Sequence, residues 1–116
     1  MDDTEAEFWS ALEYRITSEL WGFEDKLLRS LWCDGLVPEE YDLRANKPCI
    51  RGTAYCGQSG QDRWRFMLLL GERTAGERAP QIDWSALLPG EDLTGWLSVH
   101  ARERILVVDP GSAFVA

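Results

Sequence analysis

The 116-residue sequence lacks most of the residues on which common enzyme and metal chemistries depend. It has one histidine, His100, no Cys-x-x-Cys pair and no glycine-rich loop ending in Gly-Lys-Ser or Gly-Lys-Thr. Zinc sites need closely spaced cysteines or histidines, and nucleophilic catalysis needs an oriented general base, which a histidine in an expected turn does not supply. The sequence therefore predicts no metal, no cofactor and no catalytic residue, and favours a non-catalytic protein over an enzyme.

Long apolar runs and a paired set of cysteines are also missing. The longest apolar run, residues 66–70, is far shorter than the roughly 18 residues that cross a bilayer, and the acidic N-terminus does not resemble a secretory signal. The three cysteines, Cys33, Cys49 and Cys56, are an odd number, which is typical of reduced thiols. We expect a cytoplasmic protein with no membrane contact.

Positive charge is scarce in the N-terminal part of the chain. Residues 1–45 hold twelve acids and four bases, whereas the remaining residues hold eight of each, so the whole net charge of −8 belongs to the first segment. Such a surface repels phosphate backbones, which disfavours direct nucleic-acid binding. Two interpretations remain: a solvated helix surface that keeps the protein soluble, or a docking face for a basic partner.

The N-terminal segment has the pattern of an amphipathic helix. Thr4 and Glu7 have the spacing of a capping box. Behind them, apolar residues recur every three or four positions, at Phe8, Leu12, Ile16, Leu20, Phe23, Leu27 and Leu31. The pattern predicts a long helix over residues 5–33 that Gly22 kinks or divides in two, with Gly35 as its C-terminal stop.

The rest of the chain predicts a sheet. Residues 36–48 contain two prolines and no period, which indicates a loop. Residues 50–56 and 63–70 are β-rich, and the turn at residues 57–62 makes them a hairpin. A short helix after Asp83 and a second hairpin, residues 96–99 and 104–108, follow. We expect one α+β domain over residues 1–116, an antiparallel sheet of about four strands with the helix packed on one face.

The cysteines and arginines of the first hairpin belong to this scaffold. Cys49 and Cys56 are seven residues apart on one expected strand, so they face opposite sides and cannot share a metal ion. Arg63 and Arg65 share a strand face, with Arg51 as a cross-strand neighbour. We expect these arginines to pair with acids of the N-terminal helix; the alternative is an anion-binding site formed by the three.

Six tryptophans are many for this length, and tryptophan is enriched at binding hot spots. The sequence therefore favours an interaction protein that binds a basic protein partner or a second copy of itself. The candidate contact residues are Trp21, Glu24, Asp25, Asp34 and Trp84. The alternative is a small-ligand-binding or enzymatic domain, with a tryptophan- and arginine-lined pocket between helix and sheet.

Overall fold

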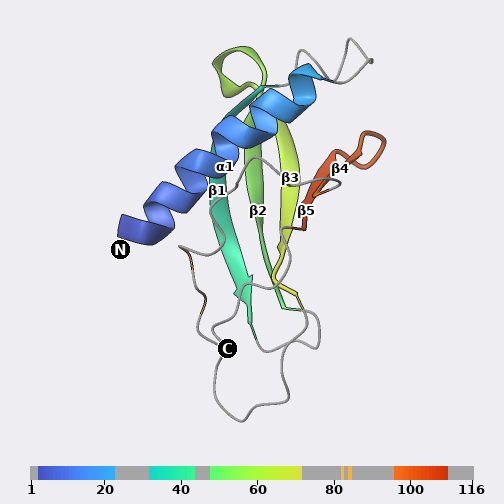
Figure 1. The fold of residues 1–116 in the computed structure, drawn as a ribbon. Coiled ribbons are helices and arrows are strands. Elements are labelled where there is room, and N and C mark those ends of the chain that lie inside the picture. Colours follow the sequence, from blue (N-terminus) through green and yellow to red (C-terminus); the bar gives the residue numbers. More distant parts are fainter. Residues whose placement is uncertain are drawn as a thin grey trace.

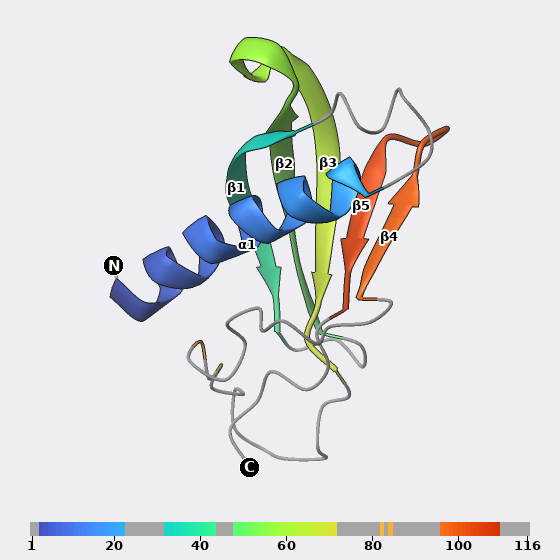
Figure 2. The same ribbon diagram turned by 45° about the horizontal axis from the view of Figure 1, so that its top comes forward.

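A computed structural model describes residues 3–22, 32–43, 48–71, 82, 84 and 96–109. Within these ranges the chain forms one helix, α1 (Asp3–Trp21), a short 3-10 turn (Gln58–Gly60) and five strands. The strands are β1 (Cys33–Asp42), β2 (Cys49–Cys56), β3 (Asp62–Leu69), β4 (Leu97–His100) and β5 (Ile105–Val108). Figures 1 and 2 show α1 crossing one face of the sheet diagonally, so the fold is α+β. No helix in the described part is long and apolar enough to cross a membrane.

The sheet is mixed, with the strand order β1-β2-β3-β5-β4. Both predicted hairpins are confirmed: β2 pairs antiparallel with β3, and β4 pairs antiparallel with β5. The β2–β3 reversal uses backbone with positive φ at Gly57 and Gly60, 75° and 63°, which glycine adopts without a Cβ clash. The strands number five rather than about four, and the parallel pair of β3 with β5 was not predicted.

The helix is shorter than the sequence predicts. The predicted apolar stripe is confirmed within the described residues, since Phe8, Leu12, Ile16 and Leu20 are at most 1% exposed. However, α1 ends at Trp21, and Gly22 lies in the following turn. The later stripe positions fall within residues 23–31, outside the described residues, and Cys33 already begins a strand. The expected helix end at Gly35 is therefore wrong, because Gly35 pairs with Tyr55 in the sheet.

Strand β1 replaces most of the loop expected over residues 36–48. Within the described five-stranded sheet it lies at one edge and pairs with β2, and its register shifts between Cys33 and Gly35 and between Pro38 and Glu40. An edge strand tolerates proline, glycine and bulges because one of its sides needs no pairing partner in the sheet. These features removed the alternation that would have predicted the strand.

The core fills the space between α1 and one face of the sheet. Its helix side consists of the stripe and Trp9, and Trp84 packs against it with ring centroids 5.2 Å from Phe8 and 5.9 Å from Trp9. The sheet side is apolar on every strand that α1 covers: Leu36, Ile50, Ala54, Trp64, Phe66, Leu68, Leu106 and Val108 are buried. Each large side chain contributes roughly 1.5–3 kcal/mol by leaving water. We call this side of the sheet the covered face and the opposite side the open face.

Candidate interaction surfaces

The outward stripe of α1 carries two large exposed aromatic residues. Tyr14 is 77% exposed and Trp21 is 64% exposed. They are seven residues apart, which is close to two helical turns, so both project from the same side. Glu7, Ser10 and Ser18 are exposed on the same stripe. We call these five residues, Glu7, Ser10, Tyr14, Ser18 and Trp21, the outer face of α1.

Three other acids of the helix have intramolecular partners. Glu13 accepts a hydrogen bond from the Leu36 backbone N–H at 2.9 Å, and Glu19 lies 3.5 Å from the Arg15 guanidinium. Glu5 accepts hydrogen bonds from the Trp9 indole and from the Tyr41 hydroxyl. Glu5 and Glu13 therefore attach α1 to β1, while Glu19 pairs within the helix.

The other predicted contact residues are not assembled around Trp21. Asp34 is exposed near the start of β1, and Trp84 is partly buried against Phe8 and Trp9. Glu24 and Asp25 lie outside the described residues. Tyr14, which was not among the predicted contact residues, is the other large aromatic residue exposed on the outer face. Two sequence signals identify it: its spacing of seven residues from Trp21 and its place outside the apolar stripe.

A shallow groove runs along the seam between α1 and β1. Its volume is about 300 Å³, and it is lined by Glu5, Ala6, Trp9, Leu36, Pro38 and Tyr41. The Tyr41 hydroxyl donates to Glu5 at 2.7 Å. Burial, followed by this hydrogen bond and the Glu5 charge, raises the pKa of Tyr41 to about 12. The neutral phenol is therefore the form that holds the first turn of α1 to the edge strand.

The arginines lie on the open face, away from α1. Arg51 forms ion pairs with Glu40 and, at 3.7 Å, with Asp42, and both acids belong to β1. The expectation that the arginines pair with helix acids is therefore wrong for Arg51, because the sheet separates this guanidinium from α1. Arg63 lies over the Tyr55 ring, 5.8 Å from its centroid. No ion pair to Arg65 is found among the residues that the structure describes.

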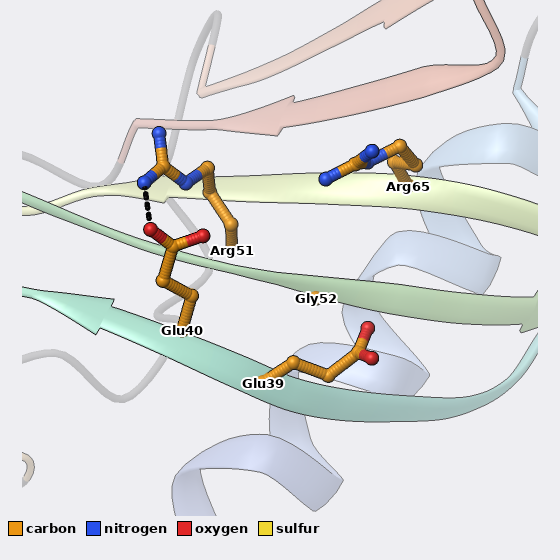
Figure 3. Close-up of a pocket in the computed structure, with 5 residues that line it drawn as sticks. All are labelled: Glu39, Glu40, Arg51, Gly52 and Arg65. Carbon is orange, nitrogen blue, oxygen red and sulfur yellow. Dashed lines mark hydrogen bonds and ion pairs between the residues drawn. The ribbon is translucent and has the colours of Figure 1, made fainter.

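Figure 3 shows how these side chains surround a groove on the open face. Arg51, Arg65, Glu39 and Glu40 rise from three neighbouring strands on one side of the sheet, with α1 behind it, and Gly52 lies between them. The groove has a volume of about 380 Å³. Thr53 donates a hydrogen bond to Glu39 at 2.5 Å. Two carboxylates thus accompany Arg51 and Arg65, and Arg63 is not among the lining residues.

The cysteines occupy two separate places. Cys56 belongs to the core cluster on the covered face, whereas Cys49 is buried outside that cluster, as expected for an odd offset along β2. Cys33 is the direct cross-strand neighbour of Cys56, which the sequence did not predict because this pairing depends on β1. Among the described residues, no three histidine, cysteine or acidic side chains form a group that could hold a metal ion.

Comparison with known proteins adds no relative from which function could be transferred. No protein family, curated protein or solved structure matches the chain.

Proposed function

We propose that the chain is a non-catalytic protein-interaction domain whose outer face of α1 binds a basic protein partner. The observation that carries this proposal is the exposure of Tyr14 and Trp21 on one side of the helix, 77% and 64% respectively. Aromatic side chains combine a large apolar surface with a polar tip, and tyrosine and tryptophan are enriched among hot-spot residues.

The contrast with the three tryptophans of the core supports a role for Trp21; Trp32, 37% exposed, does not belong to that core set. Trp9, Trp64 and Trp96 are 8% exposed or less, so the fold has the means to bury indole rings where it needs them for stability. Tyr14 and Trp21 add little to the core, and an exposed pair of this size is the kind of surface that a partner covers.

Charge complementarity favours a basic partner. The segment that α1 spans, residues 3–21, contains five acids and one base, and the whole chain has a net charge of −8. Glu7 lies on the outer face itself, about two helical turns before Tyr14. Such a field accelerates the encounter with a positively charged surface and selects against acidic partners, while the two rings supply the contact area.

The test is affinity capture from the native cell extract with the whole chain as bait, in low and high salt. We expect wild type to retain a protein with a basic isoelectric point, the variant Tyr14→Ala/Trp21→Ala to lose it, and high salt to weaken its retention. Val37→Ala is the matched control, because it shortens another exposed apolar residue, 45% exposed, on β1. Equal capture by the double variant and by wild type would contradict the proposal.

Self-association is measured on the same samples by light scattering after size exclusion. A dimer of the wild type that Tyr14→Ala/Trp21→Ala converts to monomer would assign the outer face to a second copy and overturn the choice of a basic partner. A wild-type monomer together with a captured basic protein supports it.

A small-anion site on the open face is the second candidate. It is favoured by the exposure of Arg65 and its lack of an ion pair among the described residues, next to Arg51 in one groove. The pocket lined by both tryptophans and arginines is not assembled from the described residues, because Trp64 faces α1 while Arg65 faces the other way. Calorimetric titration with inorganic phosphate tests this site, and Arg65→Ala must abolish any heat that wild type gives.

A further inference from the structure

Two of the three cysteines face each other across the first strand pair. Cys33 of β1 and Cys56 of β2 are register partners, and both belong to the core cluster on the covered face. The Gly57 N–H donates to the Trp32 carbonyl at 2.9 Å, just outside this pair. In an antiparallel ladder, that bond makes Cys33 and Cys56 a non-hydrogen-bonded pair, the type in which opposite side chains approach most closely.

This type of pairing satisfies the geometric requirement for a disulfide. Opposite residues in non-hydrogen-bonded pairs have Cα atoms about 4.5 Å apart, inside the range of roughly 4.4–6.8 Å that disulfides span. The two thiols are close enough for a side-chain hydrogen bond between them. A bond between them therefore needs no rearrangement of the sheet.

The interaction also makes the two thiols unequal. The hydrogen bond from Cys33 lowers the pKa of Cys56, whereas the same bond, burial and the negative charge of its neighbours raise the pKa of Cys33. Cys56 is the better thiolate and Cys33 the proton donor beside it. The exposures of Cys56 and Cys33 are 1% and 7%, so oxidation needs a local opening of the strand pair, and a smaller opening admits a small oxidant than a bulky disulfide.

We propose that Cys33 and Cys56 form a site of reversible oxidation, at which a small peroxide converts the dithiol into a disulfide that joins β1 to β2. The Cys56 thiolate attacks one peroxide oxygen, the O–O bond breaks, and the released hydroxide takes up the one proton that the Cys56 thiol gave up and leaves as water. The Cys33 sulfur then attacks the resulting sulfenic acid, the S–O bond breaks, and its oxygen leaves as a second water. Two thiols and one hydrogen peroxide thus give one disulfide and two waters.

The disulfide would cross-link the part of the sheet that also binds α1. The Cys33 backbone N–H donates to the Thr17 hydroxyl of α1 at 2.9 Å, so the cross-link ties together the strand pair on which the second half of α1 rests. Because it closes a loop from the first residue of β1 to the last residue of β2, oxidation should raise the melting temperature, by on the order of 10 °C.

The experiment treats the reduced full-length protein with hydrogen peroxide under native conditions, alkylates the remaining thiols and maps the peptides by mass spectrometry. We expect one peptide pair linked through Cys33 and Cys56, alkylation of Cys49 alone, the higher melting temperature, and full reversal by dithiothreitol. Alkylation of all three cysteines after peroxide treatment, or a linkage that involves Cys49, would overturn the proposal.

Matched variants separate this chemistry from general oxidation. Cys49→Ser must form the linkage as wild type does. Cys33→Ser and Cys56→Ser must each leave no intramolecular bond and no peroxide-dependent rise in melting temperature. If sulfinic acid accumulates at Cys56 in wild type as fast as in Cys33→Ser, Cys33 does not resolve the sulfenic acid and the proposal fails.

Discussion

The two faces of the sheet are built from the same strands but are held by different physics. Along β2, Ile50, Ala54 and Cys56 are at most 1% exposed beneath α1, while Arg51 and Thr53 between them are only partly buried on the open face. The covered face contains the core, and no charged side chain is buried in the described part of the chain. The open face carries ion pairs and a hydrogen bond whose atoms remain near water.

This difference separates stability from recognition. Burial of apolar surface is the main stabilising contribution, whereas solvent-exposed ion pairs contribute little because water and salt screen them. The exposed residues of the open face and of the outer face of α1 are therefore the places where residues can change without loss of the fold, whereas Cys49 is buried on the open side. Pairs of matched substitutions, one on each face of the sheet, test this difference through the change that each causes in the free energy of unfolding.

The largest effect is expected at Gly52, whose missing side chain makes room on the covered face. A Cβ there would lie 2.1 Å from the Val37 carbonyl oxygen and 2.8 Å from the Phe66 ring. Gly52→Ala should therefore lower the free energy of unfolding by about 3 kcal/mol, as overpacking of a core does. Urea unfolding followed by tryptophan fluorescence measures the change.

Gly35→Ala is its counterpart, because Gly35 pairs with Tyr55, whose neighbours Ala54 and Cys56 point to the covered face. No atom lies within 4 Å of a Cβ at Gly35, so a change within about 0.5 kcal/mol is expected. Similar losses in the two variants would show that the faces do not differ in packing.

The sequence predicted the elements whose signals are local. The stripe from Phe8 to Leu20 marks the buried side of α1, because every fourth position faces the core. The glycines at 57 and 60 mark a reversal, because they supply positive φ where the chain turns. Both signals lie within a few residues of the structure that they specify.

The elements that were missed depend on distant partners. Strand β1 contains Gly35 and Pro38 and takes its order from pairing with β2 and from Glu13 and Thr17 of the helix. The parallel pairing of β3 with β5 joins segments that are forty residues apart, Arg65 with Ile105, and no local pattern encodes it. The Cys33–Cys56 pair was missed for the same reason, and so was the orientation of Arg51 toward β1.

A smaller effect is expected where α1 meets the edge strand. The Thr17 hydroxyl accepts the Cys33 N–H at 2.9 Å, and Thr17→Val removes the acceptor while it keeps the shape. An N–H left without a partner in a partly buried place costs about 1 kcal/mol or somewhat more, which thermal or urea unfolding can resolve.

Thr53→Val makes the same substitution on the open face, where the Thr53 hydroxyl donates to the exposed Glu39 carboxylate. Water replaces that bond and valine suits a strand, so the free energy of unfolding should change by less than about 0.5 kcal/mol. A larger loss for Thr53→Val than for Thr17→Val would reverse the comparison between the two faces.

The smallest effect concerns Tyr41, at the margin of the covered face, and appears only in alkaline solution. Its pKa is raised from 10.0 to about 12 in the folded protein, first by the partial burial of a ring that is still 46% exposed and then by Glu5, so folding favours the neutral phenol. That contribution to stability is complete below pH 10 and is lost as the pH rises through about 12. Titration of phenolate absorbance should show a component near pH 12 that Tyr41→Phe removes and that Glu5→Gln moves to lower pH. Because partial burial is the first cause, the pKa of Tyr41 in Glu5→Gln should stay above 10.0. A return of this pKa to 10.0 would contradict the expectation, because it would show that the Tyr41 hydroxyl is as accessible to water as groups on the open face.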